Sequence, residues 1–212
     1  MTTSTHTLHR HDVRTAISAD VPRIARLLAR AFADDPVVAW AIPGPRRRRQ
    51  RSGRAFAAIT ELYLPKGHVY ADAQLRCAAL WAPPGSTQVT PGQILRVLPG
   101  LAAAYRGRLP LVLSGLVRVQ RRQPSEPYWY LAYLGTDPDH QGLGLAGAVL
   151  APVLDRCDRE GLAAYLEASK PELIPFYERH GFVIVQRIDL PAGPPVWAMR
   201  REPRPSVATP RR

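Results

Sequence analysis

The sequence predicts a protein of the α/β (α+β) class, in which helices flank one sheet. Three observations predict this class. Segments with the two-residue period of a strand alternate along the chain with segments of helical period. The length of 212 residues suits a single domain with a substantial core, over residues 1–201, and is short for two domains. A glycine-rich turn at residues 141–147 stands between a β-prone run and an amphipathic helix.

The N-terminal region is predicted to form a strand and then an amphipathic helix. Residues 12–17 alternate polar and apolar side chains, and apolar residues recur at helical spacing from Val21 to Phe32. Ser18 is the expected N-cap of this helix. The Asp-Asp-Pro run at residues 34–36 is expected to end it, because proline lacks an N–H donor and restricts the residue before it.

An arginine-rich helix and a hairpin follow. We expect the helix over residues 45–62 and two short strands at residues 68–73 and 77–81, joined by a weak turn. Beyond them, Pro, Gly and polar residues bracket two apolar stretches of helical pattern, near residues 94–105 and 111–119. These stretches predict a helical insert ahead of the next strand.

The C-terminal half carries the central strand and a long helix. Residues 128–136 are rich in aromatic and aliphatic side chains, and residues 145–160 have an apolar helical face that stops at Gly161. The elements expected after it are a strand at residues 163–167, a short helix at 173–180 and strands at 182–190 and 196–200. We expect a flexible N-terminus at residues 1–10 and a disordered tail at 202–212.

Composition narrows the classes of function. The formal net charge is +12, but the basic clusters lack interleaved aromatic side chains, which favours a solvated surface over nucleic-acid binding. A positive field would also suit a polyanionic cofactor. We expect a cytoplasmic protein, because no apolar run reaches the roughly 18 residues of a membrane span and no secretory signal is present. Cys77 and Cys157 lack metal-site spacing, so no metal is expected.

The turn at residues 141–147 is a candidate anion site. It opens directly into the predicted helix at residues 145–160, and the first turn of a helix has backbone N–H groups without intrahelical partners at the positive end of its dipole. Gly142 and Gly144 lack the Cβ atoms that would keep a pyrophosphate away from these donors. The segment therefore suits a phosphate-bearing cofactor.

Two motifs give the segment a family resemblance. Gln141-x-x-Gly144-x-Ala146 is similar to the Gln/Arg-x-x-Gly-x-Gly/Ala signature of the GNAT superfamily of N-acetyltransferases, and it stands in the expected place between strand and helix. Residues 166–169 and 175–182 resemble the second conserved region of that family. More narrowly, nearly the whole chain resembles the puromycin N-acetyltransferases, apart from the two tails and much of the insert.

The resemblance implies a fold and a reaction. The fold would be a mixed, mostly antiparallel sheet of six or seven strands flanked by helices, with a helical insert at residues 91–123 before the central strand. The protein would transfer acetyl from acetyl-CoA to a primary amine of a small molecule. The sequence leaves open whether it is a monomer or homodimer. An aminonucleoside or another antibiotic is the implied acceptor.

The resemblance also implies which residues form the site. Backbone groups of the splayed central strand would bind the pantetheine arm, and an N–H near Leu134 would polarise the acetyl carbonyl. The implied cofactor-binding residues are Leu134, Gly135, Thr136, Gln141, Gly142, Leu143, Gly144, Leu145, Ala146, Gly147 and Ser169. Tyr177 aligns with a tyrosine that protonates the departing sulfur in many members. Leu173 departs from the family pattern, which often has asparagine there.

The general base and the acceptor pocket stay open. The base is Glu167, at the end of the next strand, or a chain of water molecules. The pocket would lie between the first two helices, the central strand and the strands near the C-terminus, where acids beside aromatic faces would suit a cationic amine. Its candidate residues are Asp34, Asp35, Trp40, Trp81, Tyr130 and Tyr133. The alternative is that these acids cap or end a helix and the tryptophans belong to the core.

Other functions are compatible with parts of the sequence. Gly142-x-Gly144-x-x-Gly147 is also a dinucleotide-binding pattern, with Glu167 20 residues beyond it. Against this alternative, residues 136–141 separate the strand from the first glycine, and too little chain follows for further βα units. A catalytically silent acyl-CoA-binding module and a basic nucleic-acid-binding protein are two further alternatives.

Overall fold

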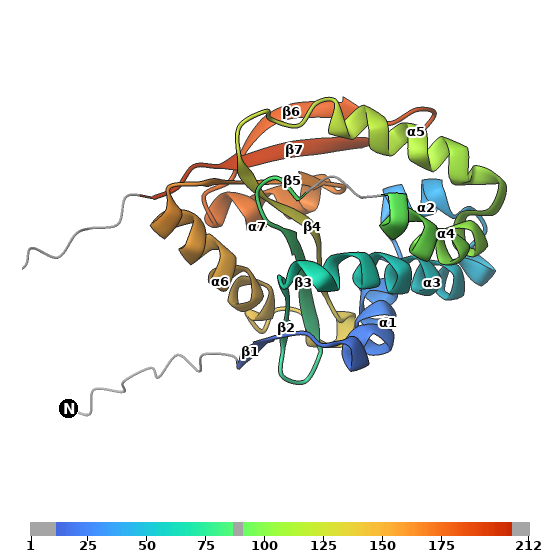
Figure 1. Ribbon diagram of the computed structural model, residues 1–212, viewed down its shortest axis with the longest axis horizontal. Helices are drawn as coiled ribbons and strands as arrows, with labels where there is room; N and C mark the ends of the chain where they lie inside the picture. Colours follow the sequence, from blue (N-terminus) through green and yellow to red (C-terminus); the bar gives the residue numbers. More distant parts are fainter. Residues whose placement is uncertain (1–11, 87–90, 205–212) are drawn as a thin grey trace, which may run out of the picture.

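A seven-stranded sheet runs through the molecule, with helices on both faces (Figure 1). The computed structural model describes residues 12–86 and 91–204. Within them the strand order is β1-β2-β3-β4-β5-β7-β6, and every neighbouring pair is antiparallel except β4 and β5. The strands are β1 (Val13–Thr15), β2 (Val69–Asp72), β3 (Cys77–Ala82), β4 (Tyr128–Thr136), β5 (Ala163–Ala168), β6 (Val183–Asp189) and β7 (Pro195–Arg201). The predicted mixed, mostly antiparallel sheet is confirmed.

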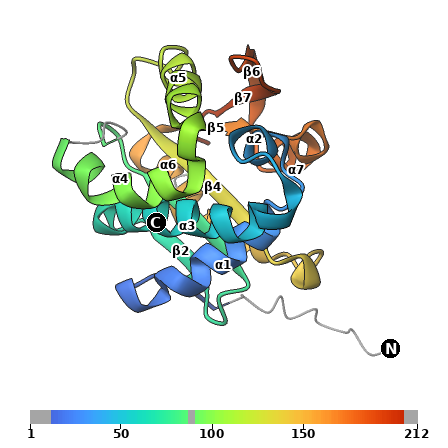
Figure 2. The ribbon, with the colours of Figure 1, turned by 90° about the vertical axis from the view of Figure 1, so that its right-hand side faces the viewer.

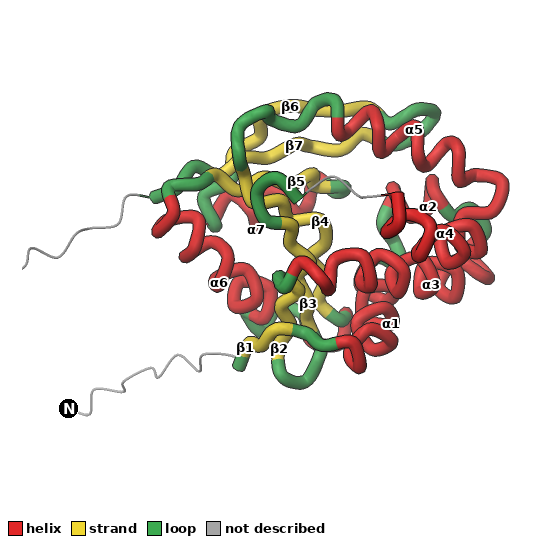
Figure 3. The backbone as a smooth tube through the Cα atoms, viewed as in Figure 1, coloured by secondary structure: helices red, strands yellow, loops and turns green. Residues whose placement is uncertain are grey.

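The helices agree with most of the predicted ones. They are α1 (Val21–Ala31), α2 (Pro36–Ala41), α3 (Pro45–Tyr63), α4 (Pro91–Tyr105), α5 (Leu109–Gln120), α6 (Leu145–Glu160) and α7 (Ile174–Arg179). The pair α4 and α5 directly precedes β4 and is the predicted helical insert. In Figure 3 both insert helices lie on the side of the sheet where α3 lies, away from α6.

Side-chain alternation along the strands divides the core into layers. Trp81 of β3 belongs to a buried cluster with α6, whereas its neighbour Leu80 packs with α1 and α3 on the other face. A third cluster joins the C-terminal half of the sheet to Trp40 of α2 and Val119 of α5. In Figure 2, β4 lies between α5 and α1. The central strand is therefore covered by the insert at one end and by the first helix at the other.

The start of α1 differs from the predicted one. Ser18 begins a 3-10 turn, Ser18–Asp20, that continues into α1, and its side chain caps neither element. Instead the carboxylate of Asp20 accepts the N–H of Ile17 at 2.9 Å and pairs with Arg14 at 2.7 Å. The prediction of Ser18 as the N-cap is wrong, because the chain is already helical when it reaches that residue.

Helix α2 was not predicted. The Asp-Asp-Pro run follows the end of α1, as expected, and it also starts this short helix. Oδ1 of Asp35 accepts the backbone N–H groups of Val37 and Val38, each at 2.9 Å, with Pro36 in the first helical position. An acidic N-cap followed by proline is a common helix start, so the signal was present in the sequence.

The sheet opens between its two central strands. Residues 128–131 of β4 pair with residues 163–166 of β5, and within the described residues this pairing goes no further. Pairing of β4 with β3 continues to Thr136, past a register shift at Leu80 and Trp81 that leaves Ala132 as an extra residue. The strands thus diverge beyond Leu131, which is the splay that the family resemblance implied.

The ends of the chain are described in part. Residues 1–11 and 205–212, which include the predicted flexible N-terminus and most of the predicted tail, lie outside the described residues. At residues 202–204 the chain still contacts the body of the protein, since the N–H of Arg204 donates to Asp158 at 2.7 Å. In the described part of the chain, no helix combines the length and apolarity needed to cross a membrane.

Candidate active site

The glycine turn lies at the N-terminus of α6 and exposes a row of backbone donors. Gly142 and Gly144 have φ values of +77° and +76°, which side chains other than glycine rarely adopt. Among the described residues, the backbone N–H groups of residues 141–147 have no hydrogen-bond acceptor. A Cβ built on Gly142 meets no atom within 4 Å. Donors, helix dipole and open space together fit an anionic group.

Helix α1 holds this turn against the sheet. Arg30 of α1 pairs with Asp137 at 2.9 Å and with Asp139 at 2.7 Å, just ahead of the turn. At Gly135 of β4, a Cβ would lie 2.8 Å from Leu28 of α1, so glycine allows the helix to pack directly on the strand. The turn and the end of β4 are therefore positioned by one helix.

A cavity of about 680 Å³ extends along the turn and the end of β4. It contains all the expected cofactor-binding residues except Ser169: Leu134, Gly135, Thr136, Gln141, Gly142, Leu143, Gly144, Leu145, Ala146 and Gly147. Lys170 and Arg179 place positive charges on its wall, and two acids, Asp35 and Glu172, also line it. The charges and donors suit a molecule with phosphates, such as the CoA that the resemblance implied.

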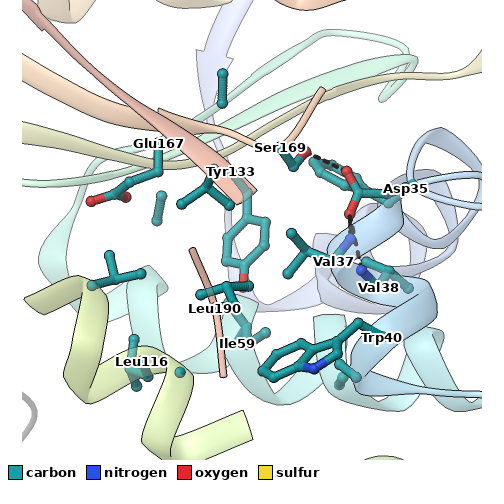
Figure 4. A pocket seen from close by; sticks show the side chains of 18 of the residues that line it. Asp35, Val37, Val38, Trp40, Ile59, Leu116, Tyr133, Glu167, Ser169 and Leu190 are labelled. Atoms are coloured by element: carbon teal, nitrogen blue, oxygen red, sulfur yellow. Dashed lines mark hydrogen bonds between the residues drawn. The ribbon is translucent and has the colours of Figure 1, made fainter. Parts of the chain in front are cut away.

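A second cavity of about 230 Å³ lies between the sheet and the helices α2, α3 and α5 (Figure 4). Asp35, Trp40, Tyr130, Tyr133 and Glu167, all expected site residues, line it. In Figure 4, Glu167 and Ser169 lie toward the sheet, and Trp40 and Leu116 lie toward the helices. The predicted location of the acceptor pocket coincides with this cavity.

The two cavities meet beside the open end of β4. The residues that line both are Phe32, Asp35, Leu134, Leu173 and Tyr177. Tyr177 is 7% exposed and packs edge-on against Phe176 and Phe182, with ring centroids 5.2 and 5.9 Å away. Burial raises the pKa of Tyr177 above its ordinary value, so the phenol keeps its proton at neutral pH. Its hydroxyl has no hydrogen-bond partner among the described residues.

Glu167 holds a carboxylate on the wall of the smaller cavity. Its Oε2 accepts the Tyr130 hydroxyl at 2.7 Å, and its Oε1 accepts the side-chain N–H of Gln123 at 3.1 Å. Burial raises the pKa of Glu167, and the two donors offset part of that rise because they favour the charged form. The group is thus a stronger base than an ordinary carboxylate.

Gln123 was not predicted from the sequence as a residue of the site. It follows α5 and receives the hydroxyl of Tyr128 at 2.9 Å, so it links that tyrosine to Glu167. No local pattern could identify it, because 44 residues separate it from Glu167. The insert therefore reaches the candidate base directly.

The structure corrects two of the expected acceptor residues. Trp81 is fully buried under α6 and lines neither cavity, because alternate residues of β3 face opposite sides of the sheet. Asp34 is exposed and also lies outside both cavities. For these two residues the alternative holds: the tryptophan belongs to the core, and the acid stands at the end of a helix.

Asp35 lies at the junction, and its carboxylate is bonded to Ser169 on the wall of the smaller cavity. Oδ1 of Asp35 caps α2, and Oδ2 accepts the hydroxyl of Ser169. Ser169 lines the smaller cavity rather than the cavity along the glycine turn, where the resemblance placed it. This pair ties the end of β5 to the start of α2 and so closes one wall of the smaller cavity.

The arrangement of strands and donors bears on the alternatives. A dinucleotide-binding fold needs several successive parallel strands, whereas β4 and β5 form the sole parallel pair among the described strands. The described residues contain no group of three or more His, Cys, Asp or Glu side chains placed to hold a metal ion.

Known proteins resemble the chain in sequence. Residues 95–182 match the model of the Acetyltransferase (GNAT) family. An uncharacterized N-acetyltransferase of Schizosaccharomyces pombe is 28% identical over 183 residues, which cover 81% of this chain and 74% of the relative. The family match spans the insert, the central strand, the glycine turn and α7.

Solved structures resemble it in fold. A Corynebacterium glutamicum structure described as histone acetyltransferase HPA2 and related acetyltransferase has a TM-score of 0.68 and 26% identity, and the alignment covers 93% of this chain and 98% of that one. The polyamine N-acetyltransferase of Drosophila melanogaster has a TM-score of 0.58 and 16% identity, with 90% and 98% covered. The second likeness concerns the fold alone.

Proposed function

We propose that this chain is an acetyltransferase of the GNAT superfamily, which the sequence and fold comparisons support, and that it transfers the acetyl group of acetyl-CoA to a primary amine of a small molecule. One observation carries the proposal: the two cavities meet at Leu134 and Tyr177. The larger cavity has the donors and charge for CoA, and the smaller one has room for an acceptor. A donor and an acceptor bound at once would have their reacting ends at this junction.

The larger cavity would hold CoA through backbone groups. The unpartnered N–H groups of the turn would bind the diphosphate, with Lys170 and Arg179 nearby. The open edge of β4, at Leu134, Gly135 and Thr136, would pair with the pantetheine arm as an added strand. When bound, acetyl-CoA supplies an acetyl thioester, in which an attacking amine exchanges the C–S bond for a C–N bond.

Two side chains would manage the protons of this exchange. Glu167 would accept a proton from the amine, either directly or through water, since its pKa is raised by burial. Tyr177 would donate its phenol proton to the leaving sulfur, because it is neutral at the junction and free of other hydrogen bonds among the described residues. The N–H near Leu134 would polarise the carbonyl, a role that does not depend on side-chain identity.

The proposal also concerns the identity of the acceptor. The resemblance to the puromycin N-acetyltransferases supports an aminonucleoside antibiotic as one acceptor to test, in which case acetylation would confer resistance. The smaller cavity supports an acceptor that enters between α2, α3 and α5. Recognition by Trp81 or Asp34 is not supported, because neither residue lines this cavity. The insert would therefore help to choose the substrate.

The test is an acetyl-CoA-dependent thiol-release assay on the purified protein. The panel includes puromycin, simple aromatic and aliphatic amines, polyamines, aminoglycosides and peptides with free N-termini. We expect thiol release that depends on one class of amine, and mass spectrometry should find the product heavier by one acetyl group. Tight acetyl-CoA binding by calorimetry without release for any amine would instead support the silent acyl-CoA-binding module.

A further inference from the structure

The smaller cavity has the size of a compact ring system. Its volume is about 230 Å³, whereas an apolar cavity of roughly 150 Å³ can hold benzene. One or two fused rings with a short amine-bearing chain would fill it. A larger acceptor would have to leave most of its atoms outside the cavity.

The walls of this cavity are mainly apolar and aromatic. Phe32, Phe56 and Tyr133 form one aromatic group, with centroid distances of 5.4 to 5.9 Å between the rings. Helix α5 supplies Leu116 and other aliphatic side chains on the opposite wall. Such a lining favours an apolar ligand body, because transfer of apolar surface out of water is favourable.

Trp40 is a fixed flat wall rather than a mobile side chain. Its indole N–H donates to the carbonyl of Pro191 at 3.2 Å. A Cβ on Gly115 of α5 would lie 2.8 Å from Cη2 of the indole, and a Cβ on Gly193 would lie 2.7 Å from Nε1. Both glycines therefore leave room for the ring and hold it between two segments that are distant in sequence. A planar surface that is already ordered loses little entropy when a flat ligand stacks on it.

Acidic groups on the walls are few. Asp35 accepts three hydrogen bonds, two from the N-terminus of α2 and one from Ser169, whereas Glu167 accepts two, so Glu167 keeps more acceptor capacity for an amine. A polycation would place further charges against apolar walls without partners, which costs free energy. The cavity thus suits an acceptor with one amine.

We propose that the acceptor of this enzyme is a primary monoamine carried on a compact aromatic body of one or two rings, and that Trp40 and Leu116 determine this specificity. The inference rests on the acetyltransferase function proposed above and goes further by naming the class of acceptor. The ring would lie against Trp40 and Leu116, and the amine would point to Glu167.

The test compares four amines as acceptors, first with the unsubstituted enzyme and then with variants of Trp40 and Leu116. The acceptors are 2-phenylethylamine, tryptamine, n-hexylamine and spermidine. We expect kcat/KM for the two aromatic amines to exceed that for n-hexylamine by roughly tenfold and that for spermidine by more. Trp40→Ala should lower kcat/KM for the aromatic amines by roughly tenfold while KM for acetyl-CoA is unchanged, and Trp40→Phe should restore most of it.

A variant of Leu116 provides a second test, which does not depend on whether the Trp40 variants fold. Leu116 lines the cavity and is 49% exposed, and Leu113 is 45% exposed on the same helix but lines neither cavity. Leu116→Phe should therefore narrow the cavity and lower kcat/KM for tryptamine more than for 2-phenylethylamine, whereas Leu113→Phe should leave both values unchanged.

The outcomes separate the two proposals. Equal kcat/KM for spermidine or n-hexylamine and the aromatic amines, or equal behaviour of Leu116→Phe and Leu113→Phe, would overturn the acceptor class and leave the acetyltransferase function standing. Failure of every amine in the panel, with acetyl-CoA bound, would overturn the function itself.

Discussion

Tyr130 and Glu167 lie on the neighbouring parallel strands β4 and β5, and the hydroxyl of Tyr130 donates a 2.7 Å hydrogen bond to Oε2 of Glu167. Tyr130 stands opposite Tyr165, so Glu167 is two residues further along β5 and its side chain faces the same side of the sheet. The bond lies one residue before the strands diverge. It therefore holds a buried carboxylate beside the opening where the two cavities meet.

This bond predicts how activity depends on pH. If Glu167 is the base, kcat/KM should fall as pH drops through a pKa that is higher than that of an ordinary carboxyl, because burial raises it. Tyr130 donates to the charged form and so lowers the pKa. Tyr130→Phe should raise it further and move the acid limb to higher pH, and Gln123→Leu should shift it in the same direction. The measurement is kcat/KM against pH with one amine for all variants.

The matched control for this prediction is Tyr165→Phe. Tyr165 is a buried tyrosine of β5 that lines neither cavity, and its hydroxyl has no hydrogen-bond partner in the described part of the chain. The dependence of kcat/KM on pH in Tyr165→Phe should match that of the unsubstituted enzyme. An acid limb that does not move in Tyr130→Phe would remove Glu167 from the role of base and leave a water chain.

Tyr177→Phe should separate chemistry from cofactor binding. Loss of a general acid lowers the rate by about 100-fold or more, so kcat should fall by that factor. The ring remains, with its packing against Phe176 and Phe182, so the Kd of acetyl-CoA measured by calorimetry should stay the same. Tyr165→Phe again serves as the control. An undiminished kcat in Tyr177→Phe would show that the sulfur leaves without this phenol.

Two glycines at opposite ends of α6 test the cofactor turn. Gly142 precedes the helix with φ +77°, Gly161 follows it with φ +67°, and a Cβ at either position meets no atom within 4 Å. Alanine at each should cost about 1 kcal/mol of stability through backbone strain. The Gly142→Ala change should in addition weaken acetyl-CoA binding, because its Cβ would enter the space where the diphosphate approaches the backbone. Equal affinity in the two variants, by calorimetry, would place the diphosphate elsewhere.

A buried ion pair should control stability near the C-terminus. The guanidinium of Arg201, whose side chain is 4% exposed, donates to both carboxylate oxygens of Asp158 at 2.8 Å. Asp158→Asn would leave a buried charge unpaired and should lower the free energy of unfolding by about 3 kcal/mol at neutral pH. Urea unfolding would measure the loss. Asp155→Asn, an exposed change on the same helix, should have little effect.

The direction in which the free energy of unfolding changes with pH follows from the pKa of Asp158. The hydrogen bonds from Arg201 lower that pKa in the folded protein, so the pair contributes stability at pH values above the unfolded pKa. The contribution is lost as pH falls through the folded pKa. The difference between the unsubstituted protein and Asp158→Asn should therefore shrink in acid. A constant difference would mean that the variant acts through packing alone.

Some of this architecture follows from local sequence. The strand at residues 128–136 and the helix at residues 145–160 were predicted with the bounds that the structure has. Their signals are local, because an aromatic β-prone run, two glycines at positive φ and a continuous apolar helical face each act over a few residues. The start of α1 was mispredicted, and α2 was missed although its cap at Asp35 and Pro36 is a local signal, because a helix of six residues has little periodicity of its own.

The residues around the smaller cavity could be identified only from the tertiary structure. The local sequence does not distinguish Trp81 from Trp40. The alternation of side chains along β3 directs Trp81 into the core, whereas two glycines distant in sequence leave room for Trp40 at the cavity wall. Ser169 reaches Asp35 across 134 residues of sequence and Gln123 reaches Glu167 across 44.

The sequence by itself therefore determined the class of fold and the glycine turn as a candidate anion site, because those depend on patterns a few residues long, and the family resemblance pointed to the candidate acid. Only the folded chain decided which side chains share a cavity and what that cavity accepts. Such contacts join segments far apart in the chain, and they form only when the sheet, α2 and the insert pack together.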